Sequence, residues 1–148
     1  MEIRYPARLE PQEGGGYFVS FPDFADTFTE GDSEEEALYY ASEVLTAMLE
    51  TKIAHDLPIA APSPAGPGER LIAPDAKTQA ALLVRFARGP RALADLARAL
   101  GTSWPAAKRL EDPGHWPSLK SLERAAAALG QRLVLSFEET KTGRDHTR

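Results

Sequence analysis

Cysteine is absent from all 148 residues of this chain, and so are long apolar runs. The lack of cysteine excludes disulfides, thiolate metal sites and cysteine nucleophiles. No run reaches the roughly 18 apolar residues of a membrane helix, and residues 1–4 are predicted to begin a strand rather than a signal sequence. With 43% hydrophobic residues the chain can still bury a core. We therefore expect a cytoplasmic globular protein with no membrane partner.

Signals for catalysis are equally scarce. His55, His115 and His146 show no i, i+4 pairing, and Gly14–Gly16 is not followed by Gly-Lys-Ser/Thr. Neither a zinc-binding helix nor a phosphate loop is therefore predicted. The aspartates near the N-terminus fall at predicted turns, where Asp is favoured because it hydrogen-bonds to nearby backbone. We expect no catalytic residue, no cofactor and no metal.

The chain has a strongly uneven charge distribution. Residues 1–76 hold four basic and fifteen acidic residues, a net charge of −11, whereas residues 77–148 hold thirteen basic and seven acidic residues, a net charge of +6. An acidic half suits a cationic partner and a basic half suits nucleic acid. Both halves could also be ordinary solvated surfaces, so charge by itself does not decide the function.

A proline-rich segment at 58–68 connects the two halves. Its prolines exclude a helix and favour an extended, semi-rigid connection. A short strand over 69–73 is expected to return to the first sheet, which puts the domain boundary near Pro74. The predicted domains are therefore 1–74 and 75–138, followed by a disordered tail at 139–148.

The acidic half is predicted to form a sheet followed by a helix. Alternating residues predict strands over 2–10, 17–21 and 27–30, with a tight turn at Gly14–Gly16. Asp32-Ser33 followed by Glu35-Glu36 is typical of a capping box at a helix start. Apolar residues then recur at helical spacing over 34–49, so one face of this helix is expected to cover the sheet.

The order of a Tyr-Pro strand, a GGY hairpin, an FPD corner and GDSEEEA at the helix start resembles the HicB antitoxin family over about the first half of the chain. One departure is Phe24–Phe28, which stands where the family usually carries a Pro-Gly-Cys-like turn. The resemblance implies a degenerate, partial ribonuclease H-like domain that binds a HicA-type toxin, a small basic RNA-cleaving protein. It places toxin contact at the sheet edge and corner loop, on Tyr17, Asp23, Phe24, Asp26, Glu30 and Asp32.

The basic half is predicted to contain four helices, over 77–88, 91–100, 103–111 and 118–129. Within it, the run LARALGTSWPAAKRLE resembles the Xre/Cro-type helix-turn-helix, whose pattern is LAxxLGxSxxxVSRxE. A small residue, Ala97, suits close packing of the two helices, and Gly101 suits the turn between them. The resemblance implies binding to operator DNA and repression of the protein's own operon.

In a helix-turn-helix the second helix enters the major groove. On this alignment its exposed side carries Ser103, Trp104, Ala106, Lys108 and Arg109, while Thr102 and Lys120 approach phosphates. Arg109 is the candidate for a bidentate contact to guanine. Trp104 stands where the family more often has glutamine, and it either meets DNA or packs in a core or interface. Trp116 is expected to be structural, wedged with Pro117 between helices.

A final alternation predicts a strand over 132–137 with no partner strand in an otherwise helical half. An unpaired edge invites another copy, so we expect a homodimer or higher homo-oligomer. The contact residues would be Leu133, Val134, Leu135 and Phe137.

The predicted fold class is α+β: an N-terminal partial ribonuclease H-like β-β-β-α-β domain, then an all-α helix-turn-helix domain with a terminal strand. The predicted function is that of a non-enzymatic antitoxin and repressor. Two other functions stay open. One is a free-standing transcriptional regulator with a ligand-sensing N-terminal domain, and the other is a nuclease that retains magnesium-dependent activity.

Overall fold

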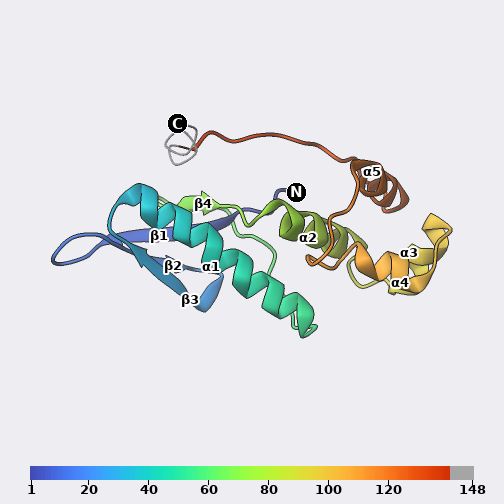
Figure 1. Cartoon of the computed structure of the whole chain (residues 1–148), viewed down its shortest axis with the longest axis horizontal. Helices are drawn as coiled ribbons and strands as arrows, with labels where there is room; N and C mark the ends of the chain where they lie inside the picture. The colour runs from blue at the N-terminus through green and yellow to red at the C-terminus, as the bar shows by residue number, and fades with distance from the viewer. Residues whose placement is uncertain (141–148) are drawn as a thin grey trace. The chain divides into compact units, whose positions relative to one another are not determined.

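A computed structural model describes residues 1–140, which form two compact units (Figure 1). The sheet unit contains Ile3–Leu49, Ala60–Asp75 and the described residues from Ser136 onward. The helical unit contains Met1–Glu2, Glu50–Ile59 and Ala76–Leu135. Each unit has buried hydrophobic residues of its own.

Four antiparallel strands form the sheet, in the order β3-β2-β1-β4. They are β1 (Tyr5–Pro11), β2 (Tyr17–Phe21), β3 (Phe24–Gly31) and β4 (Arg70–Ile72). The turn between β1 and β2 requires left-handed backbone, and Gly14, Gly15 and Gly16 adopt φ values of 90°, 107° and 80° there. β3 and β4 form the two edges of the sheet.

Helix α1 (Glu34–Ala54) crosses one face of the sheet, as Figure 1 shows. Its buried residues, Ala37, Ala41, Leu45 and Leu49, recur every fourth position and so form one stripe along the helix. The helix starts at the predicted capping box. The Glu36 amide donates to Ser33 Oγ at 3.1 Å, and the Glu36 carboxylate accepts from the Asp32 amide at 2.9 Å.

Close packing ties the start of α1 to the sheet. A Cβ added at Gly31 would lie 2.5 Å from the Ala37 nitrogen, so only glycine fits there. Glu34 forms an ion pair with Arg70 of β4 at 2.6 Å. The helix continues to Ala54 rather than ending at 49 as predicted, and the positive φ of 55° at Asp56 follows its last turn.

The helical unit contains α2 (Ala76–Arg88), α3 (Leu93–Leu100), α4 (Trp104–Arg109) and α5 (Leu119–Ala128). All four lie where the hydrophobic periodicity predicts helices, with ends that differ by two residues or fewer. Their shared core is small and aliphatic. It consists of Val84, Leu96, Ala97, Ala107, Ala125 and Leu129.

The α+β architecture, with an antiparallel sheet followed by helices, is confirmed. The strand predicted over 132–137 does not form within the described chain by itself. This segment pairs with no strand in the described part of the chain, and Phe137 is fully exposed. Alternation becomes a strand only when a neighbour completes the hydrogen-bond ladder, and none of the described strands does so. Of the predicted tail, residues 139–140 are exposed and irregular, and 141–148 lie outside the described residues.

Candidate functional site

The corner between β2 and β3 holds the proline-rich segment against the sheet. The Asp23 carboxylate accepts hydrogen bonds from the Ser63 hydroxyl at 2.6 Å and from the Ser63 amide at 3.0 Å. The Tyr5 hydroxyl donates to the Ala60 carbonyl at 2.8 Å. Burial, with a smaller contribution from the Asp23 charge, raises the pKa of the Tyr5 phenol well above its usual range. We call residues 60–63, held in this way, the strap.

Two residues predicted to contact a toxin therefore have partners inside the sheet unit. Asp23 holds the strap, and Phe24 is buried with its ring centroid 4.8 Å from that of Tyr5. The other four are more accessible. Tyr17 is half-buried at the start of β2, and Asp26, Glu30 and Asp32 are exposed.

The strand pairing places Phe28 and Glu30 on one face of the sheet, opposite Ser20 and Phe18 of β2, and the exposed Asp26 lies two residues before Phe28 in the irregular part of β3. Phe28 is 57% exposed and lies 5.8 Å from the ring of Phe18 in β2. Neither phenylalanine was predicted from the sequence to contact a partner. The feature that could have indicated Phe28 is an aromatic residue between two acidic ones in the run Asp26 to Glu30.

In the helical unit, the turn between α3 and α4 is built as the helix-turn-helix pattern requires. Gly101 has φ 65° and ψ 37°, and the Thr102 amide donates to the Ala97 carbonyl at 3.0 Å. Ser103 caps α4, because its hydroxyl accepts from the Ala106 amide at 3.2 Å. Ala97 is buried as predicted.

Most residues predicted to contact DNA are exposed. They are Thr102, Ser103, Trp104, Lys108, Arg109 and Lys120, whereas Ala106 is half-buried. Trp104 is 49% exposed, and the Lys108 ammonium lies 5.5 Å from its ring centroid. A lysine at that distance gives the aromatic surface a positive charge in a cation–π arrangement.

The predicted wedge at Trp116 is wrong, since this side chain is 74% exposed. It lies in the loop before α5, and the Lys77 ammonium is 5.2 Å from its ring. A Trp-Pro pair between two helices does not by itself create a cavity for the indole. From α5, Ala125 packs in the core instead.

A half-buried ion pair fixes α2 to the end of α4. Arg88 donates to both carboxylate oxygens of Glu111, at 2.6 and 3.0 Å. The bond to Glu111, aided by the charges of Glu111 and Asp56, raises the pKa of Arg88 further above its usual value. Sequence reasoning did not identify this pair, although Glu111 is the last residue of the helix-turn-helix pattern.

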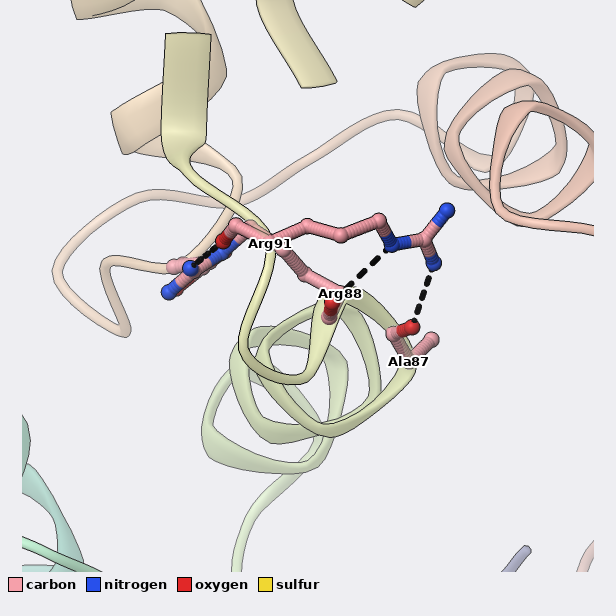
Figure 2. Close-up of polar contacts among 4 residues, drawn as sticks. Ala87, Arg88 and Arg91 are labelled. Carbon is pink, nitrogen blue, oxygen red and sulfur yellow. Dashed lines mark hydrogen bonds and ion pairs between the residues drawn. The ribbon is translucent and has the colours of Figure 1, made fainter. Parts of the chain in front are cut away.

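Arg91 completes this junction at the C-terminus of α2 (Figure 2). Its guanidinium donates to the carbonyls of Ala87 at 2.9 Å and Arg88 at 3.1 Å, while Arg88 donates to the Arg91 carbonyl. Unpaired carbonyls at a helix end favour such cationic donors. Arg88 and Arg91 are therefore used for internal structure.

Two of the four predicted dimerisation residues, Leu133 and Val134, line an apolar groove of about 300 Å³ in the helical unit. Helices α2 and α5 supply Leu83, Phe86 and Leu122 to the same groove. Leu133 is half-buried, whereas Val134 and Leu135 are 80% and 65% exposed.

No group of three or more histidine or acidic residues within residues 1–140 is placed to hold a metal ion. A helix long and apolar enough to cross a membrane is likewise not found in that range.

Comparison with known proteins identifies the class. The profile described as "HicB_like antitoxin of bacterial toxin-antitoxin system" matches residues 4–80, more than half of the chain. This chain therefore belongs to the HicB-like antitoxin family, as the sequence motifs predict.

Individual relatives extend the similarity over almost the whole chain. Antitoxin HicB 1 of Photorhabdus laumondii is 33% identical, over 92% of this chain and 88% of the relative. Antitoxin HicB of Escherichia coli K12 is 30% identical, over 90% of this chain and 98% of its own length. Antitoxin HicB 2 of Photorhabdus laumondii is 31% identical, over 90% of this chain and 95% of the relative. The similarity thus includes the helical unit as well as the sheet unit.

Proposed function

We propose that this chain is an antitoxin that neutralises a HicA-type toxin through its sheet unit and represses its own operon through its helical unit. The observation that carries the proposal is the similarity to HicB antitoxins over about nine tenths of the chain. It favours an antitoxin over a free-standing regulator, because the relatives are named for that role. We infer a non-enzymatic, cytoplasmic protein that acts by binding.

Charge supports the division of roles. Residues 1–76 carry a net charge of −11, and Asp26, Glu30 and Asp32 are exposed on the sheet unit. A toxin that cleaves RNA needs a cationic surface for phosphates. Carboxylates that occupy that surface would exclude RNA and would also steer the two proteins together.

The helical unit supports the DNA-binding role. Its α3–turn–α4 geometry has the left-handed glycine and the capped second helix of a helix-turn-helix, and Lys108 and Arg109 are exposed on α4. We assign base reading to Arg109 and phosphate contact to Lys120. Two copies would read two half-sites about one helical turn apart.

We further propose that the chain is organised as a partial ribonuclease H-like domain over 1–74 and a DNA-binding and dimerisation domain over 75–138. Dimerisation would use Leu133, Val134, Leu135 and Phe137, of which the last three are exposed apolar side chains and Leu133 is half-buried. Pairing with the same segment of a second copy would supply the missing ladder.

Co-expression with the product of the adjacent reading frame, which we expect to be a short basic protein, tests the antitoxin role. We expect the pair to co-purify and growth arrest by the basic protein to be relieved. Failure of both would exclude the proposed function. Truncation after Gly130 should retain toxin binding but lose dimerisation in sedimentation experiments, and a truncated chain that stays dimeric would place the dimer contact elsewhere.

DNA binding is tested with the upstream region of the operon and with random duplex. Arg109→Ala should lower affinity for the operator more than for random DNA, because base contacts carry specificity. Lys120→Ala should lower the affinities for operator and random DNA equally, and the number of ions released on binding, read from the salt dependence, should fall by about one. Equal losses on both DNAs for Arg109→Ala would refute base reading by this residue.

A further inference from the structure

The sheet of this protein has one face under α1 and one face with an unusual row of side chains. Strand register places Phe18 of β2 directly between Glu10 of β1 and Glu30 of β3. The next row on the same face places Ser20 between Arg8 and Phe28. We call this surface the open face.

Phe18 and Phe28 form an aromatic pair on the open face, with ring centroids 5.8 Å apart and a tilt of 31°. Phe28 is 57% exposed even though β3 offers buried positions at Phe24 and Thr27. Large rigid aromatic side chains are frequent anchors of protein interfaces, because they bury much area at little cost in conformational entropy. An aromatic pair with one ring exposed and the other half-buried favours a binding surface over a solvated one.

Carboxylates surround the aromatic pair. Glu10 and Glu30 are exposed and flank Phe18 across the strands, and the exposed Asp26 precedes Phe28 by two residues in the irregular part of β3. The one basic residue of these two rows, Arg8, is already paired with Glu69 at 2.9 Å. The open face therefore offers apolar rings and net negative charge to a partner.

We infer that the open face is the primary docking surface for the cationic face of the toxin, with Phe18 and Phe28 as its anchors; this inference rests on the proposed function. Lysine and arginine fit this surface in two ways, because they pair with carboxylates and also stack on aromatic rings. A second copy of the same face fits poorly, since Glu10, Asp26 and Glu30 would then meet like charges. Asp23 and Phe24 support the surface from within the sheet unit.

The α1 surface provides a matched control. Tyr39 and Tyr40 also form an exposed aromatic pair, with centroids 5.6 Å apart and exposures of 47% and 40%. They lie in the same acidic unit but on the helix. If any exposed aromatic side chain of this unit contributed to toxin binding, substitutions in both pairs would lower the affinity. If the open face is the docking surface, only substitutions of the phenylalanines should do so.

The experiment measures affinity between the full chain and the co-expressed basic toxin for wild type, Phe28→Asp and Tyr39→Asp. We expect Phe28→Asp to raise the Kd for the toxin by about 30-fold or more, as for an interface hot spot. Tyr39→Asp should change the Kd by less than about threefold. The Kd of Phe28→Ala, which adds no charge, should lie between those of wild type and Phe28→Asp. Far-ultraviolet circular dichroism confirms that each variant is folded.

A second arm tests the charges through kinetics. Glu30→Lys should slow association at low salt and flatten its salt dependence, whereas Glu43→Lys on α1 should change association much less. Unchanged affinity for Phe28→Asp alongside loss for Tyr39→Asp would overturn the inference and move the surface to α1. A Phe28→Asp chain that binds toxin normally but sediments as a smaller oligomer would also overturn it, because the occupant would be a second copy. A wild-type chain that does not bind the toxin at all would refute the proposed function itself, and this inference with it.

Discussion

Removing the Glu111 carboxylate should selectively destabilise the helical unit. Glu111→Ala leaves the Arg88 guanidinium without its bidentate acceptor in a place where it is only 19% exposed. Breaking a fully buried pair from one side costs about 3–5 kcal/mol, because the remaining charge is desolvated and uncompensated. The pair here keeps some access to water, with Glu111 itself 10% exposed. We therefore expect a loss of about 2–3 kcal/mol in the free energy of unfolding of this unit.

The distribution of aromatic residues makes the measurement specific. Trp104 and Trp116 both lie in the helical unit, and all four tyrosines lie in the sheet unit. Tryptophan fluorescence during urea unfolding therefore follows the helical unit, while tyrosine signals follow the sheet. We expect the tryptophan midpoint to fall for Glu111→Ala with little change in the tyrosine transition.

Two controls separate ion pairing from other effects. Asp95→Ala removes the partner of Arg98 in an exposed pair, and it should change stability by less than about 1 kcal/mol. The double variant Arg88→Met with Glu111→Met removes both charges and should recover much of the loss. If Glu111→Ala costs no more than Asp95→Ala, the ion pair does not stabilise the junction and the reasoning fails.

Three further outcomes are expected. Tyr5 should ionise at a higher pH than is usual for tyrosine in an alkaline titration followed by ultraviolet absorbance. Because its pKa is raised on folding, its stabilising contribution is complete below pH about 10 and is lost as the pH rises towards the folded pKa. If the absorbance change shows no tyrosine with a raised pKa, the environment assigned to Tyr5 is wrong. Gly31→Ala should destabilise the sheet unit by about 1–3 kcal/mol in the tyrosine transition, because the added Cβ meets the Ala37 backbone, and an unchanged midpoint would show that α1 shifts freely. Ser103→Ala should lower the free energy of unfolding in the tryptophan transition by about 1 kcal/mol, because the α4 cap is lost. Ser103→Asp can still cap the helix and should retain most of that free energy. Equal losses for the two variants would argue against capping.

Local sequence signals predicted local structure well. The strand at 17–21, the capping box at Ser33 and Glu36 and the turn at Gly101 all depend on residues within a few positions of one another. Their geometry follows from backbone preferences and short-range hydrogen bonds, which the sequence displays directly.

Contacts between distant residues were not predictable in the same way. Asp23 was interpreted as a turn residue and partner contact, but Ser63, forty positions away, satisfies its carboxylate. Arg88 and Glu111 are separated by 23 positions, and neither has a local pattern that indicates the other. The strand at 132–137 was predicted from alternation, yet a strand also needs a neighbour that no local pattern can supply.

The strap held by Tyr5 and Asp23 limits proteolytic cleavage of the chain at residues 60–63. A protease must draw several residues of extended backbone into its active site, and residues 60–63 are fastened at both Ala60 and Ser63. Cleavage there requires those hydrogen bonds to open first, and its rate follows the population of the open strap when reclosing is fast. The lifetime of the intact protein against cleavage at this segment is therefore set by a few local hydrogen bonds rather than by the global stability of either unit.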